Sequence, residues 1–175
     1  KGRASDSAAA FDTAIRKALY PASMILVAQA LQSDQRFADS VKLLKKVLSQ
    51  DANNPAALIL LGRGFTSVGA YTDAEVVLRK ASMITVGGVS GWSGLAELYL
   101  RVGKPDAAED ALLKAARFAD GSDRFELARL FAAVGDAFLK TGGQVAAERA
   151  FRKARELNPE LAADAVKVTR GKGKN

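Results

Sequence analysis

The sequence predicts an all-α fold, in which antiparallel helix pairs stack along the chain as a solenoid. One observation is a periodic series of small residues, Ala28, Gly62, Ala96 and Gly135. Its spacing is 34 residues between the first three members and 39 before the last. A second observation is that bulky residues follow three positions later, at Leu31, Phe65, Tyr99 and Phe138. A fixed period of this length indicates a stacked-repeat architecture.

Close helix crossings explain the small residues. The stretch 62–81 is bulky and helix-like, yet it has small residues at Gly62, Ala74 and Ala81. Where two helices cross very closely, only a hydrogen or a methyl group fits at the contact. The second and third small positions recur in the other units, at Ser40, Ala108 and Ala147 and at Val47, Ala115 and Ala154. We therefore expect these positions to be helix-crossing contacts.

Each repeat is predicted to consist of a helix, a short turn and a second helix. In the second repeat, apolar residues at helical spacing cover 55–68, and Gly69 ends them as a C-terminal cap would. Thr72 and Asp73 then offer capping oxygens for a helix that opens at Ala74.

The corresponding turns of the other repeats use different residues. The third repeat turns at Gly103 and Pro105, because proline is tolerated in a first helical turn. The fourth repeat uses Gly142 and Gly143. The first repeat has no glycine here and relies on Asp-Gln-Arg at 34–36, so it matches the pattern least well.

The period sets the boundaries of the repeats and of the chain ends. The predicted repeats are 21–54, 55–88, 89–122 and 128–161, with an insertion at 123–127 that we interpret as an extra turn and a half on the following helix. Within the N-terminal segment 1–20, residues 8–19 form an amphipathic helix, either half of a preceding repeat or a terminal cap. The C-terminal segment 162–175 is predicted to complete a capping helix over 161–168 and to end in a basic, disordered tail. Because the chain begins Lys-Gly-Arg without methionine, we interpret it as an excised or processed piece.

The motifs resemble the tetratricopeptide repeat family. The third repeat carries its signature at Trp92, Leu95, Ala96, Tyr99, Ala108, Leu112 and Ala115, and the fourth at Phe131, Val134, Gly135, Phe138, Ala147, Phe151, Ala154 and Pro159. The sequence departs from the signature at Met24 and Leu58, which replace an aromatic residue, and at Ala52 and Val86, which replace a late proline. The resemblance covers residues 21–161. It implies a right-handed superhelix whose first helices line a concave, partner-binding groove.

Residues for common catalytic and metal chemistry are missing. The chain has no histidine and no cysteine, which excludes histidine bases, thiol nucleophiles, zinc–thiolate clusters and disulfides. Two acidic pairs, Asp73 with Glu75 and Glu109 with Asp110, are interpreted as parts of solvated, salt-bridged helix faces. The glycine-rich stretch 86–94 follows a helix and lacks the lysine and Ser/Thr of a phosphate-binding loop. We expect no enzyme activity, no cofactor and no metal site.

The repeat register allows us to name the inward positions of the first helices. The predicted partner-binding groove consists of Ile25, Gln29, Ile59, Arg63, Ser93, Glu97, Leu100 and Asp136. A complementary ligand would bring apolar anchors, a carboxylate near Arg63 and a basic residue near Glu97, as an amphipathic helix or an extended segment could. The alternative is that Arg63 pairs with Glu97 across neighbouring helices.

The formal net charge of +7 is reflected in a second predicted surface. This basic ridge consists of Lys45, Lys46, Arg79, Lys80, Lys114, Arg152 and Lys153. Cations are favourable near helix C-termini, which gives the ridge a structural explanation. The functional alternative is contact with an acidic partner, an anionic membrane or nucleic acid. No aromatic residues are interleaved with these charges, which argues against nucleic acid.

These observations predict a non-catalytic protein-interaction module or assembly scaffold that holds a peptide or a partner helix in the groove. Self-association and the identity of the partner are left open. One alternative function is binding of an anionic polymer or membrane surface through the ridge, and another is regulation within a larger enzyme. No apolar run approaches the roughly 18 residues needed to cross a bilayer, so we expect a soluble segment, cytoplasmic or periplasmic.

Overall fold

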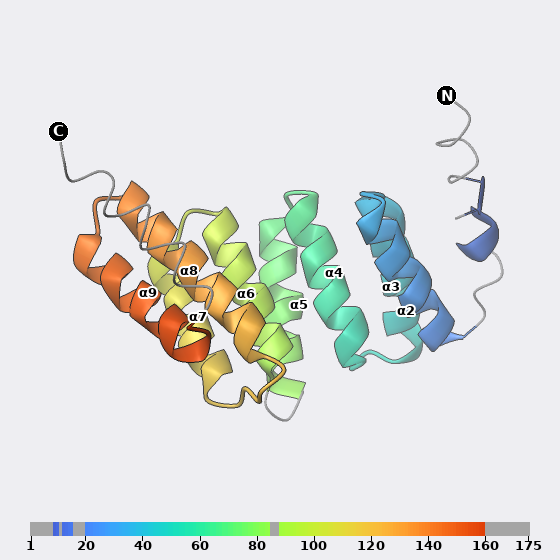
Figure 1. The fold of residues 1–175 in the computed structure, drawn as a ribbon. Coiled ribbons are helices and arrows are strands. Elements are labelled where there is room, and N and C mark those ends of the chain that lie inside the picture. The colour runs from blue at the N-terminus through green and yellow to red at the C-terminus, as the bar shows by residue number, and fades with distance from the viewer. Residues whose placement is uncertain (1–8, 11, 16–19, 85–87, 160–175) are drawn as a thin grey trace. The chain divides into compact units, whose positions relative to one another are not determined.

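Helices make up the regular structure of the computed structural model, which describes residues 9–10, 12–15, 20–84 and 88–159 (Figure 1). These ranges contain no strand. The chain divides into two compact units, residues 1–85 and residues 86–175, called unit 1 and unit 2 below. No helix in the described ranges has both the length and the apolar character needed to cross a membrane.

Unit 1 contains two helix pairs, coloured blue to green in Figure 1. Its helices are α2 (Pro21–Ser33), α3 (Phe37–Gln50), α4 (Pro55–Ser67) and α5 (Tyr71–Ile84). Consecutive helices pack against one another, and α2 also contacts α4. The first helices of the two repeats therefore lie side by side within this unit.

Unit 2 repeats this plan. Its helices are α6 (Val89–Arg101), α7 (Pro105–Ala116), α8 (Arg124–Lys140) and α9 (Gln144–Leu157). Here too consecutive helices are packed, and α6 contacts α8. The predicted order of helix, turn and helix is thus present in all four repeats.

The small residues lie where paired helices cross most closely. Gly62 of α4 faces Leu78 of α5, and a Cβ at this position would overlap the leucine side chain. Gly135 of α8 faces Phe151 of α9, and a Cβ there would lie 2.7 Å from the phenylalanine ring. The alanines at the other small positions are buried, at residues 28, 74, 81, 96, 108, 115, 147 and 154. The packing explanation of the small residues is therefore confirmed.

The turns inside the four repeats share one backbone conformation. Gly69, Gly103 and Gly142 have φ of 81°, 72° and 80°, in the left-handed region that favours glycine. Gln35 occupies the same position in the first repeat and adopts the same conformation, with φ of 61°. A side chain in this region is strained by its Cβ. The least well matched repeat thus has the same turn geometry as the others without a glycine.

The structure corrects one predicted helix start. Helix α5 begins at Tyr71 and not at Ala74, so Thr72 and Asp73 lie inside its first turn and do not precede it. The acidic side chain of Asp73 still suits this place, because the first turn of a helix carries a partial positive charge.

The insertion before the fourth repeat lengthens a helix. Helix α8 has 17 residues, whereas α2, α4 and α6 have 13 each. It begins at Arg124, preceded by Asp123 as the N-cap residue.

The two chain ends are described only in part. Within the N-terminal helix predicted over 8–19, residues 9–10 and 12–15 are helical. The remainder of that helix, the predicted C-terminal capping helix and the basic tail lie outside the described residues.

Candidate interaction surface

The first helices of unit 1 carry four of the predicted groove residues. Ile25 and Gln29 lie on α2, and Ile59 and Arg63 lie on α4. Gln29 is exposed and the other three are half-exposed. Helices α2 and α4 are in contact, and we call the exposed faces of these two helices that carry the four residues the unit 1 surface.

A part-buried polar contact connects the two helices of the unit 1 surface. The amide nitrogen of Gln32 in α2 donates to the backbone oxygen of Leu60 in α4 at 2.7 Å and to the Ser40 hydroxyl at 3.1 Å. Gly64 packs beside the same amide, where a Cβ would lie 3.1 Å from its nitrogen. The contact satisfies a polar side chain between helices and so holds α2 in register with α4.

The first helices of unit 2 carry the other four predicted groove residues. Glu97 and Leu100 on α6 are half-exposed, and Asp136 on α8 is exposed. Ser93 on α6 is only 3% exposed, so its side chain is buried in the structure and does not form part of a contact surface. We call the exposed faces of α6 and α8 the unit 2 surface.

A cation outside the predicted groove residues lies on the unit 2 surface. The guanidinium of Arg129 on α8 is 3.6 Å from the Glu97 carboxylate of α6 and 2.7 Å from that of Glu126. The hydrogen bond to Glu126 raises the pKa of Arg129 above its already high value, against the effect of partial burial. Arg129 was missed because its counterpart in the third repeat is Ser90, although its spacing of seven residues from Asp136 places both on one helix face.

The predicted basic ridge is divided between the two units. Unit 1 carries four of its members on α3 and α5, and unit 2 carries three on α7 and α9. All seven are at least partly exposed. Two of its lysines lie over aromatic rings of first helices: the Lys45 ammonium is 5.4 Å from the centroid of Phe65, and that of Lys114 is 4.7 Å from the centroid of Trp92. Such cation–π contacts stabilise the fold itself.

Three further ridge residues also have partners within their own unit. Lys80 donates to the backbone oxygen of Ala52 at 2.7 Å. Arg79 pairs with Glu75 at 2.6 Å, and Lys153 pairs with Glu156 at the same distance. The hydrogen bond from Lys153 holds the pKa of Glu156 below its usual value. Most of the ridge charges are therefore engaged in contacts inside the molecule.

The structure corrects the interpretation of one acidic pair. Glu109 of α7 is buried, with 4% of its surface exposed, and is not part of a solvated helix face. Its two carboxylate oxygens accept hydrogen bonds from Nε and Nη2 of Arg149 in α9, at 2.8 and 2.5 Å. This bidentate pair joins two second helices of unit 2. Glu75 behaves as expected, because its pair with Arg79 lies on the surface.

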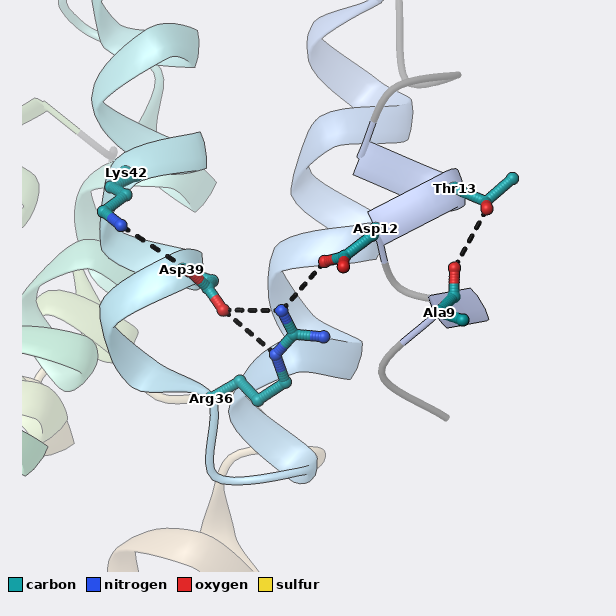
Figure 2. A network of polar contacts seen from close by, with 6 residues as sticks. All are labelled: Ala9, Asp12, Thr13, Arg36, Asp39 and Lys42. Atoms are coloured by element: carbon teal, nitrogen blue, oxygen red, sulfur yellow. Dashed lines mark hydrogen bonds and ion pairs between the residues drawn. The ribbon is translucent and has the colours of Figure 1, made fainter. Parts of the chain in front are cut away.

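A polar network connects the N-terminal helical residues to the start of α3 within unit 1. Figure 2 shows Arg36 between Asp12 and Asp39, with guanidinium–carboxylate distances of 3.1 and 2.7 Å. Lys42 adds a longer contact to Asp39 at 3.8 Å. The hydrogen bonds that Arg36 donates to the two aspartates raise its pKa. The network lies at the start of α3, so it contributes to packing and not to the unit 1 surface.

Within the described ranges, no cluster of three or more histidine, cysteine or acidic residues could hold a metal ion. The polar side chains of the two surfaces are amides, carboxylates and guanidinium groups on neighbouring helices. Such groups can bind a partner by hydrogen bonds and ion pairs on either side of apolar contacts.

Comparison with known proteins supports the fold. No family model matches the sequence, and no curated protein matches it. Among solved structures, that of MamA is similar with a TM-score of 0.70 and 20% identity, covering 90% of this chain and 94% of the other. A thermophilic TPR protein of Thermus thermophilus gives a TM-score of 0.68 at 17% identity, covering 89% and 87%. MamA 41-end from Desulfovibrio magneticus RS-1 gives 0.65 at 18% identity, covering 81% and 77%.

The first two likenesses cover 90% and 89% of this chain, and they agree with the 34-residue period, the small-residue crossings and the left-handed turns. The predicted fold class, an all-α solenoid, is confirmed. The chain therefore has the tetratricopeptide repeat fold.

Proposed function

We propose that the protein is a non-catalytic interaction module that binds a peptide or a helix of another protein on the exposed faces of its first helices. The observation that carries this proposal is the exposure pattern of these helices. In unit 1, Ile25 and Ile59 remain half-exposed, whereas Met24 and Leu58 beside them are 1% and 2% exposed. Apolar side chains thus remain accessible on helices that also bury residues in the core.

The polar residues of these surfaces support the same function. Gln29 and Arg63 in unit 1 and Glu97 and Asp136 in unit 2 add hydrogen-bonding and charged groups beside the apolar positions. An amphipathic helix laid on such a face is anchored by apolar side chains at helical spacing and oriented by the charges. The rigid helix pairs reduce the entropy that would be lost on binding.

The basic ridge is the alternative binding surface, and its contacts within the molecule argue against it. Five of its seven residues interact with a ring, a carboxylate or a backbone oxygen of their own unit. A partner that used these charges would have to compete with those contacts. We therefore propose the first-helix surfaces, and not the ridge, as the main binding region.

The experiment is crosslinking and affinity capture from native lysate with the intact chain and two surface variants. Ile59→Asp alters the unit 1 surface, and Lys46→Glu alters the ridge at an exposed lysine. Lys46 is a better control than Lys80, whose reversal would also break its hydrogen bond to Ala52. We expect Ile59→Asp to lose captured proteins and Lys46→Glu to keep them. The opposite result, with binding that weakens steeply with salt, would make the ridge the binding surface.

A further inference from the structure

Helix α8 has an extra N-terminal turn that the other first helices lack, and this turn exposes Phe125. Residues 124–127 precede the place where the repeat register starts a first helix. Within this turn, Leu127 is completely buried and secures the turn against the core, whereas Phe125 is 60% exposed. A large aromatic side chain is thus held at the surface by a packed helical turn.

Phe125 begins a continuous stripe along α8. Successive spacings of 4, 3, 4 and 3 residues connect the stripe members Phe125, Arg129, Ala132, Asp136 and Leu139. At about 100° per residue, these five positions fall within roughly 80° of one another around the helix. Every member is half-exposed or exposed, and Leu139 at the far end is 40% exposed. The two apolar ends are about 21 Å apart, at 1.5 Å per residue.

The stripe is part of the unit 2 surface. Its second member, Arg129, reaches Glu97 of α6 at 3.6 Å, so the stripe faces towards the neighbouring first helix. The residues of α8 that pack into the core lie elsewhere around the helix and include Phe131, Val134 and Phe138. A partner could therefore lie on the stripe without disturbing the packing of α8 against α9.

The charges between the two apolar ends are mainly negative. Glu97, Glu126 and Asp136 contribute three carboxylates, and Arg129 contributes one guanidinium. Three further cations on these two helices lie outside this stretch: Arg124 directly precedes Phe125, and Arg101 and Lys140 lie one turn beyond Glu97 and Asp136. A partner with a positive charge in the middle of its contact face would match this arrangement, and one with a carboxylate there would be repelled.

We propose that the α8 stripe binds a cationic amphipathic helix of a partner protein. The helix carries two large apolar residues about 14 positions apart, one against Phe125 and one against Leu139. A lysine or arginine lies between them and opposite Asp136. The proposal rests on the proposed function, since it specifies the ligand of one first-helix surface.

The test begins with selection of peptides from a random phage-displayed library against the full chain. The enriched consensus is then made as a synthetic peptide, and its dissociation constant is measured by fluorescence anisotropy. We expect a consensus with two apolar positions at helical spacing and a basic residue between them. Phe125→Ser and Asp136→Lys should each weaken binding of this peptide about tenfold or more, because the first removes an aromatic anchor and the second places a cation opposite the cation of the peptide.

Phe118→Ser is the matched control, because Phe118 is also 60% exposed and lies outside α8. It should leave the affinity unchanged, and circular dichroism should show the same helix content for all variants. Peptides that bind the Phe125→Ser chain undiminished but lose affinity for Ile59→Asp would overturn the stripe and leave the proposed function standing. Peptides that are insensitive to both variants would overturn the two together, and a selection without a consensus would overturn the stripe.

Discussion

Unit 1 and unit 2 are built on the same plan but differ in the polar contacts that join one helix pair to the next. In unit 1, the neutral amide of Gln32 connects α2 to α4 through a backbone oxygen. In unit 2, charged groups connect the pairs: Arg149 with Glu109 between α9 and α7, and Arg129 with Glu97 between α8 and α6. The apolar crossings with glycine are present in both units.

The difference shows which contacts the repeat requires and which it leaves free to vary. Close crossing needs a small residue at a set place, because no other side chain fits there. The polar contact between helix pairs only has to provide hydrogen-bond partners for the polar groups that become buried. Either an amide or an ion pair can do this. The two solutions respond differently to mutation. A buried carboxylate that loses its partner is costly, whereas an amide that loses a hydrogen bond costs only about 1 kcal/mol.

The largest effect is expected from breaking the ion pair of unit 2 on its exposed side. Arg149→Met should lower the free energy of unfolding by about 3 kcal/mol, because Glu109 remains buried without a counter-charge. Urea unfolding followed by the fluorescence of Trp92, the single tryptophan, measures this in unit 2. The double variant Glu109→Leu/Arg149→Met is the control and should recover most of the loss. If the single variant is as stable as the original chain, the pair does not anchor α9.

The next effect tests the crossing that the two units share. Gly62→Leu should destabilise the chain by about 2 kcal/mol, because the new side chain must displace Leu78. Gly135→Leu should do the same against Phe151 in unit 2. Gly121→Leu is the matched control, since a Cβ there meets no atom within 4 Å. Thermal unfolding by circular dichroism provides the comparison, and equal stability of all three variants would contradict the crossing explanation.

A smaller effect of opposite sign is expected at the turn of unit 1 that lacks glycine. Gln35→Gly should stabilise the chain by about 1 kcal/mol, because glycine adopts the left-handed conformation without strain. Gly69→Gln makes the reverse change at the equivalent turn of the same unit and should destabilise by a similar amount. Nothing lies within 4 Å of a Cβ at Gly69, so its cost would come from the backbone alone. If both variants change the free energy of unfolding by the same amount and in the same direction, the left-handed turn conformation does not determine the stability at these positions.

The smallest effect concerns the two ridge lysines that lie over rings. Lys114→Met should cost about 0.5 kcal/mol, because an exposed cation–π contact to tryptophan is lost while the apolar stem is kept. Lys45→Met should cost no more, since its ammonium lies farther from a phenylalanine ring. Urea unfolding followed by circular dichroism measures all the variants, and the emission maximum of Trp92 is a second measurement for Lys114→Met. Lys46→Met is the control. If it lowers the stability as much as Lys114→Met does, the contact with the ring is not the cause of the loss.

The helix pairs, their order and the places where they cross could all be predicted from the sequence. These features depend on the spacing of side chains along one helix and on local backbone preference, both of which recur with the period of 34 residues. The glycine turns at 69, 103 and 142 were predictable for the same reason, since left-handed backbone conformation favours glycine wherever it occurs. Even the lengthened α8 could be predicted, because the insertion interrupts the 34-residue period directly before the fourth repeat and so adds residues to its first helix.

The pairing of polar side chains, in contrast, could be seen only in the folded chain. Glu109 and Arg149 are 40 residues apart, and no periodic signal connects them. Whether Glu109 is buried or solvated depends on the crossing of α7 with its neighbours and on the side-chain conformation of Arg149. The same is true of Arg129, Ser93 and Gln32, whose exposure follows from the way neighbouring helices pack. Local sequence patterns determine where the helices lie along the chain. The partners of long polar side chains are determined by packing between residues that are far apart in the chain.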